Sequence, residues 1–289
     1  MGSSLEQYIT GWEPSTLVET DLLDERVSSW LADILDAGGL APPGVLPPTW
    51  HWVYFTDWPP YAGLGVDGHP VSGHFQPPIP ERRRMWAGGS VTSHADLRLG
   101  EAVERTGTLL SATPKSGRTG EMVLVSVRYE YRQAGDLRLT EVQNHVYRSG
   151  AGEPTGPRSW PARPTRRPSS AAPWQHDIRT DPIRLFRMSA ITGNSHRIHY
   201  DRPYATEVEG YPDLVVHGPL LAQQLATLAL RNEPSLELAQ LDYRVQAPVF
   251  VGDAVTAVGT PDGAHAELQV LSEGDRVHVA ATAGYRRRA

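Results

Sequence analysis

Cysteine is absent from this 289-residue sequence, and so are long apolar runs and an excess of basic charge. Without cysteine the chain can form no disulfide, thiolate zinc site or cysteine nucleophile. No stretch approaches the ~18 consecutive apolar residues of a membrane span, and residues 1–15 lack the basic-then-apolar layout of a signal peptide. The sequence therefore predicts a cytoplasmic protein with no membrane partner.

The charge balance is mildly acidic, with a formal net charge of -6 and a pI near 6.0. A dedicated nucleic-acid binder needs positive charge to meet phosphates, so this class is not expected. Hydrophobic residues make up 39% and charged residues 21% of the chain, which is typical of a globular protein. At ~100–200 residues per domain, the length allows one large unit or two ordinary ones.

One segment, residues 149–175, is dominated by Pro, Gly, Ser and Arg and has no apolar period. Such a composition is typical of a linker. We therefore expect an N-terminal unit over residues 1–148, a linker over 149–175 and a C-terminal unit over 176–289. The alternative is a long surface loop inside a single domain.

The two units share a short pattern. Residues 100–103 (Gly-Glu-Ala-Val) precede a Gly-Thr pair at 107–108, and residues 252–255 (Gly-Asp-Ala-Val) precede a Gly-Thr pair at 259–260. The offset is 152 in both cases, because 252 − 100 and 259 − 107 are equal. Runs with strand alternation follow in each unit, so the pattern indicates a duplicated, strand-rich unit. Chance similarity is the alternative.

Helical signals are few. A helical period between Thr20, as the cap, and Gly38-Gly39 predicts one helix. A second is predicted from Gly218, with Pro219 in the first turn, to a stop before Pro234. This second helix is apolar almost all round and should be buried. One buried helix followed by antiparallel strands predicts an α+β fold in which a sheet wraps around a helix.

Polar residues gather just before the second helix, where Asn194, His196, His199 and Asp201 occupy eight positions. The free N–H groups at a helix start can stabilise a carbonyl oxygen that becomes negative, and a nearby imidazole can move a proton. The alternatives are solvated or capping histidines, or a metal site formed by His196, His199 and Asp201. A metal site would lack a further ligand signature, so we expect none.

The run from Ile191 to Asp201, followed by His217-Gly218-Pro219-Leu220, resembles the signature of the MaoC-like, R-specific enoyl-thioester hydratases. The resemblance implies a hotdog fold. It is greatest to the branch of mesaconyl-CoA hydratases and mitochondrial-type 3-hydroxyacyl-thioester dehydratases, in which two hotdog units lie in one chain. A double hotdog with two antiparallel sheets, each wrapping a helix, is therefore expected.

The first unit resembles the degenerate N-terminal hotdog of that branch through residues 46–50, 67–70 and 84–89. If Gly38 is laid on Gly193, the position of His199 is taken by Gly44, and residues 60–80 contain no apolar helical run. The first unit is therefore predicted to be non-catalytic and to shape the acyl or CoA tunnel.

The family holds its reacting water between an Asp and a His five residues apart, and these positions fall on Asn194 and His199. Asn cannot accept a proton at neutral pH, although its carbonyl can orient a water. The resemblance thus implies that His199 moves the proton, Asn194 positions the water and the Gly218 N–H stabilises the enolate. It also implies that five neighbouring side chains bind the substrate: His196, Arg197, Tyr200, Asp201 and His217.

The predicted function is that of a hydro-lyase, which adds water to or removes it from the double bond of an enoyl or 3-hydroxyacyl thioester. The thioester partner is acyl-CoA or an acyl-carrier protein, and no cofactor is expected. An acyl-CoA thioesterase and a non-catalytic acyl-thioester-binding protein are the rival interpretations. Because two hotdog units in one chain mimic a hotdog dimer, a monomer or a homodimer is expected.

Overall fold

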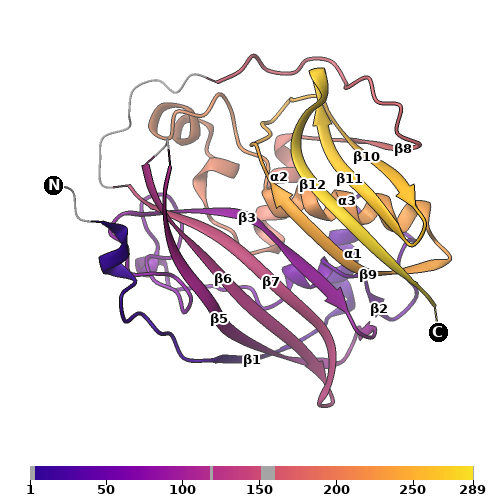
Figure 1. The fold of residues 1–289 in the computed structure, drawn as a ribbon, viewed down its shortest axis with the longest axis horizontal. Helices are drawn as coiled ribbons and strands as arrows, with labels where there is room; N and C mark the ends of the chain where they lie inside the picture. Colours follow the sequence, from indigo (N-terminus) through magenta and orange to yellow (C-terminus); the bar gives the residue numbers. More distant parts are fainter. Residues whose placement is uncertain (1–3, 118–119, 151–159, 289) are drawn as a thin grey trace.

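The fold is built on one ten-stranded antiparallel sheet in the order β1-β5-β6-β7-β3-β9-β12-β11-β10-β8 (Figure 1). The computed structural model describes residues 4–117, 120–150 and 160–288. The first-half strands are β1 (Leu17–Leu22), β3 (Arg82–Ser93), β5 (Ala102–Gly117), β6 (Gly120–Gln133) and β7 (Asp136–Ser149). The second-half strands are β8 (Trp174–Ile178), β9 (Leu236–Val245), β10 (Val255–Asp262), β11 (His265–Ser272) and β12 (Arg276–Arg287). The short strands β2 (Val45–Leu46) and β4 (Leu97–Arg98) pair separately.

The two halves mirror each other about the β3–β9 pair, since β1, β5, β6, β7 and β3 correspond in order to β8, β10, β11, β12 and β9. The two antiparallel sheets expected of a double hotdog are joined edge to edge into one, because β3 pairs with β9. The junction depends on Gly88, which has φ +146°. A Cβ there would lie 2.3 Å from the Tyr243 carbonyl oxygen.

The repeated glycines adopt matching conformations. Gly100 and Gly252 have φ of +77° and +85° and turn the chain into β5 and β10, respectively. Gly107 and Gly259 lie at equivalent points within those strands. A Cβ at either would lie 2.8 Å from an aromatic side chain, Phe75 or Trp174. The duplication predicted from the pattern is thus visible in the strand order and in the backbone.

The central helix α3 (Gly218–Asn232) begins and ends where the sequence predicts, with Pro219 in its first turn and Pro234 beyond its end. The residues from Leu220 to Ala229 are all buried, and the helix packs on β8 to β12. The helix is therefore apolar almost all round because it is buried, as predicted.

The described residues of the first half include no counterpart of α3. Helix α1 (Glu25–Ile34) is capped by Asp24, so the predicted cap at Thr20 is wrong, because Thr20 belongs to β1. Helix α2 (Pro182–Ile191) follows β8 as α1 follows β1. Where α3 would stand, the described chain has only two short 3-10 helices, η2 (Trp50–Val53) and η3 (Tyr61–Gly63). The remaining short helices are η1 (Leu5–Tyr8), η4 (Arg197–His199), η5 (Tyr204–Val208, a π-helix) and η6 (Glu273–Asp275).

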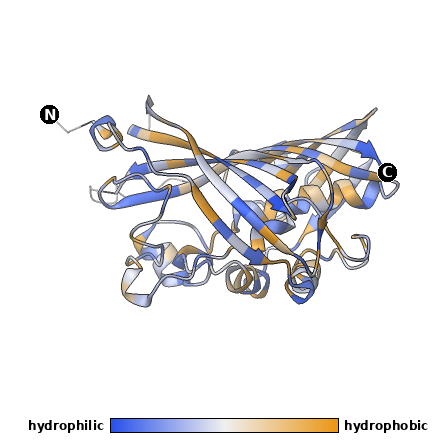
Figure 2. Ribbon diagram, turned by 90° about the horizontal axis from the view of Figure 1, so that it is seen from below, coloured by the Kyte–Doolittle hydropathy of each residue, from blue (hydrophilic) through white to orange (hydrophobic). Residues whose placement is uncertain are grey.

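The α-helices gather on one side of the curved sheet (Figure 2). The segment predicted to be a linker is described from residue 160, and residues 151–159 lie outside the described part. It is anchored to the second half, because the Trp160 indole donates to the Gly210 carbonyl at 2.7 Å and Arg163 pairs with Asp253 at 2.7 Å. Among the described helices, none has the length and apolarity that a membrane crossing requires.

Candidate active site

The predicted catalytic segment begins at the end of α2, where Gly193 takes φ +60° and turns the chain. The Asn194 side chain then accepts a hydrogen bond from the His196 backbone N–H through Oδ1, at 3.0 Å. This bond orients the amide, and Nδ2 has no partner among the described residues. Asn194 can therefore donate a hydrogen bond to a ligand through Nδ2, and Oδ1 keeps a second lone pair.

His199 lies in η4 and is 8% exposed. Its Nδ1 lies 2.7 Å from the Val215 carbonyl oxygen, to which it donates, so the lone pair is on Nε2. The ring stacks on His217, with centroids 3.7 Å apart and planes at 17°. His217 in turn is the N-cap residue of α3, and its Nε2 lies 3.0 Å from Ser189 Oγ. The structure thus holds His199 beside the start of the buried helix, as predicted.

Four imidazoles, contributed by His69, His196, His199 and His217, form a row across the site. The centroid distances along the row are 3.8, 5.5 and 3.7 Å. Burial lowers the pKa of each one below the usual value, and it lowers the pKa of His199 to about 4. At neutral pH the row is therefore uncharged, and its rings can accept hydrogen bonds.

Gly218 is the first residue of α3, so its N–H has no intrahelical acceptor. A Cβ at this position would lie 3.4 Å from the Val245 side chain, which is an ordinary van der Waals contact. The macrodipole of the 15-residue helix adds partial positive charge at this point. These features suit the stabilisation of a developing oxyanion.

Three other residues predicted to bind the substrate, Arg197, Tyr200 and Asp201, form hydrogen bonds with neighbouring residues of the same segment. Arg197 donates to the Asp201 carboxylate at 2.7 and 2.9 Å, and its guanidinium lies 4.0 Å from the centre of the Tyr204 ring. Tyr200 is 48% exposed and donates from its hydroxyl to the Ser195 carbonyl at 3.0 Å. Neither Arg197, Tyr200 nor Asp201 lines the cavities described below, so their predicted roles in binding remain predictions.

A cavity of about 260 Å³ lies between the two halves. Its second-half wall includes Asn194, His217, Pro219 and Met188, and its first-half wall includes aromatic residues such as Trp86. His199 is not among the described residues that line it, so the imidazole of the second half that borders the cavity is His217. Asn194 and the start of α3 thus line the same cavity. Both must contact a bound acyl group if they are to act on it.

The first-half wall contains a buried polar network that sequence reasoning missed. The Glu141 carboxylate accepts hydrogen bonds from Trp52 Nε1 at 2.6 Å, Gln143 Nε2 at 3.0 Å and the Tyr131 hydroxyl at 3.1 Å. His51 Nε2 lies 3.0 Å from the same carboxylate. Burial favours the neutral acid, but His51 and these hydrogen bonds outweigh burial and hold the pKa of Glu141 below its usual value.

A larger cavity of about 560 Å³ adjoins the first, and the two share a wall that includes His69 and Arg84. Among the described residues, its lining includes three arginines, Arg82, Arg83 and Arg84, and three acidic residues, Asp67, Glu81 and Glu209.

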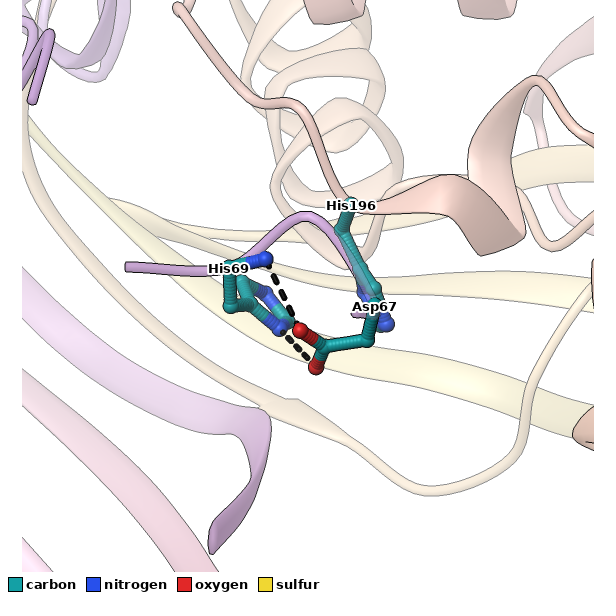
Figure 3. A group of neighbouring side chains, drawn as sticks. All are labelled: Asp67, His69 and His196. Carbon is teal, nitrogen blue, oxygen red and sulfur yellow. Dashed lines mark hydrogen bonds and ion pairs between the residues drawn. The ribbon is translucent and has the colours of Figure 1, made fainter. Parts of the chain in front are cut away.

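Residues 66–69 of the first half lie against the predicted catalytic segment of the second (Figure 3). There, Asp67, His69 and His196 present polar atoms within 4.8 Å of one another. Two imidazoles and a carboxylate can hold a divalent cation, and this group differs from the predicted one of His196, His199 and Asp201. However, His69 Nδ1 lies 3.0 Å from Asp67 Oδ2, and the two rings face each other at 3.8 Å. In-plane lone pairs of facing rings do not converge on one point, so the arrangement does not favour a metal.

Comparison with known proteins places these features in a family. The family model for hydroxyacyl-thioester dehydratase type 2 matches residues 49–251. The chain is 42% identical, over 237 residues and 82% of each chain, to mesaconyl-C(4)-CoA hydratase from Chloroflexus aurantiacus. It is 27% identical to the mitochondrial hydroxyacyl-thioester dehydratase type 2 of Schizosaccharomyces pombe, over 71% of this chain and 75% of that one.

Solved structures agree on the fold. A MaoC-like dehydratase from Phytophthora capsici matches with a TM-score of 0.65 at 16% identity, covering 98% of this chain and 99% of that one. HtdX of Mycobacterium tuberculosis matches with a TM-score of 0.63 at 17% identity, covering 95% of this chain and all of that one. The chain belongs to the hydroxyacyl-thioester dehydratase type 2 family, within the MaoC-like double hotdogs. The predicted family, fold and hydro-lyase class are confirmed.

Proposed function

We propose that this protein hydrates the α,β double bond of an enoyl-CoA, and that the reaction takes place in the 260 Å³ cavity between the two halves. The observation that carries this proposal is the convergence of Asn194 and the start of α3 on one cavity, in a chain 42% identical to a mesaconyl-C(4)-CoA hydratase. A branched or dicarboxylic acyl group of the mesaconyl type is the proposed substrate.

The thioester carbonyl accepts a hydrogen bond from the Gly218 N–H at the start of α3. As water adds at the β-carbon, negative charge builds on this oxygen, and the helix start stabilises it. Asn194 Nδ2 donates to the water oxygen. His199 stacks on His217, which borders the cavity, and we propose that its Nε2 reaches the water beside that ring, takes one proton and returns it to the α-carbon. Dehydration follows the same steps in reverse.

Arg84 is the proposed partner of a distal carboxylate. Among the described residues, two arginines line the cavity, and Arg105 already pairs with Glu19. Arg84 hydrogen-bonds the Tyr147 side chain, and no described carboxylate forms an ion pair with it. We expect Arg84→Gln to raise KM for a dicarboxylic enoyl-CoA by about tenfold or more and to leave KM for crotonyl-CoA nearly unchanged, because only the former presents a second carboxylate.

The test is an absorbance assay for loss of the conjugated double bond, run beside a free-thiol assay on short, branched and dicarboxylic enoyl-CoAs. Loss of absorbance without thiol release is the expected result. Thiol release would instead indicate a thioesterase, and no change in either signal would indicate a binding protein. Repeating the assay with carrier-protein thioesters distinguishes the two thioester partners. Size-exclusion chromatography with light scattering distinguishes the predicted monomer from the homodimer.

A further inference from the structure

The water in the proposed reaction has two O–H groups, and both are fixed before it reacts only if each finds an acceptor. Asn194 Oδ1 already accepts the His196 N–H, and its Nδ2 can donate to the water. His199 Nε2 can accept one O–H. A neutral imidazole on the opposite wall of the cavity can accept the other.

We propose that His69, oriented by Asp67, is this second acceptor and is thus a catalytic residue supplied by the first half. The inference rests on the proposed function. His69 lines the same cavity as Asn194, and its ring is the first in the row of four imidazoles. Its Nδ1–H donates to Asp67 Oδ2 at 3.0 Å, which leaves the lone pair on Nε2.

The loop that carries His69 is clamped onto the catalytic segment. The Arg197 backbone N–H donates to the Asp67 carbonyl at 2.8 Å, and Ser195 Oγ donates to the Gly68 carbonyl at 2.5 Å. Gly68 has φ +85°, and a Cβ there would lie 1.9 Å from the Ser195 carbonyl oxygen. Only glycine permits this approach, which holds the two segments in register.

The carboxylate also fixes the ring. The Asp67 side chain accepts from the His69 backbone N–H at 2.9 Å as well as from the ring, so it holds both the rotamer and the tautomer of His69. Burial lowers the pKa of His69 despite the opposing effect of Asp67, so the ring is neutral and able to accept.

The proton balance of the step is simple. One O–H bond of the water breaks and its proton passes to His199 Nε2, while the oxygen bonds to the β-carbon. The same proton then forms the new C–H bond at the α-carbon. The second O–H, held by His69 Nε2, remains in the 3-hydroxyacyl product, and nothing is oxidised or reduced.

The test uses steady-state hydration by the full-length protein and its variants. We expect His69→Ala to lower kcat by about 100-fold with a smaller effect on KM, and added imidazole to restore part of kcat. Asp67→Asn should lower kcat by about tenfold or more. His74→Ala is the matched control, since His74 lies on the same segment, contacts the Ser15 carbonyl and lines neither cavity; its kcat should equal that of the wild type.

Three results would overturn the assignment: a wild-type kcat in His69→Ala, a folded His69→Ala that imidazole does not rescue, or wild-type activity that a chelator abolishes and Zn²⁺ restores. The last would show that Asp67, His69 and His196 bind a metal. Failure of the proposed function is distinguishable, because the wild-type protein itself would then not hydrate any enoyl-CoA.

Discussion

The two halves of the molecule share a strand order but differ in what the strands enclose. The second half wraps the 15-residue helix α3, whereas the first half has the four-residue helix η2 in that place. The strands of the first half are longer than those of the second, with 16 residues in β5 against 8 in β10. In the first half, aromatic side chains and members of the Glu141 network line the cavity instead. Loss of the helix thus gives the first half a wall for the cavity.

The largest expected effect tests the catalytic side of this comparison. His199→Ala should lower kcat/KM for hydration by at least about 100-fold, because it removes the proposed proton carrier. His265→Ala is the matched control on the exposed face of β11 and should leave the rate unchanged. Steady-state absorbance kinetics check both, and ordinary turnover in His199→Ala would show that another group carries the proton.

The next effect concerns the first half, where the buried Glu141 carboxylate accepts several hydrogen bonds. Glu141→Gln should lower the free energy of unfolding by about 3 kcal/mol, because the new amide cannot accept from all of the surrounding donors. Glu104→Gln on the exposed face of β5 should change it by less than about 0.5 kcal/mol. Denaturant titrations give both values, and equal stabilities would mean that the network is not needed in place of a helix.

The neutral imidazole row predicts a stability that depends on pH. His199 has a pKa of about 4 in the folded protein against an ordinary histidine pKa of 6.5, so the unfolded chain binds more protons between these values. From pH 7 to pH 5 the free energy of unfolding should fall by about 2 kcal/mol from His199 alone. Urea titrations at both pH values should show a smaller fall in His199→Gln than in His265→Gln. An unchanged fall would mean that His199 is not buried in neutral form.

The smallest effect isolates the contact between the halves. Gly68 and Gly100 both have positive φ, but a Cβ at Gly68 would meet the Ser195 carbonyl oxygen, whereas a Cβ at Gly100 has nothing within 4 Å. Gly68→Ala should therefore destabilise the fold by about 1 to 2 kcal/mol more than Gly100→Ala does. Equal losses, measured by denaturant unfolding, would mean that the loop moves away without cost.

Features with local causes were predictable from the sequence. Helix α3 follows from Pro219, Pro234 and an apolar run, and the duplicated strands follow from glycines at one offset. The cap of α1 was missed, because Thr20 is drawn into β1 by its pairing with β5, which is a tertiary effect. The buried Glu141 had a signal, since it occupies an inward position of the alternating strand β7.

The site was predictable only in its second-half part. Asn194, His199 and Gly218 lie close in sequence to the start of α3, so their grouping has a local cause. Their roles remain predictions. The approach of residues 66–69 to the catalytic segment was not predictable, because it depends on hydrogen bonds between groups more than 120 positions apart, such as Ser195 and Gly68.

The central claim is that the acyl thioester binds between the halves with its carbonyl at the start of α3. A crystal structure of His199→Ala with bound enoyl-CoA tests it most directly. We expect the acyl group in the 260 Å³ cavity and the thioester oxygen about 3 Å from the Gly218 nitrogen. An acyl group bound in the 560 Å³ cavity, with its carbonyl away from Gly218, would contradict the account.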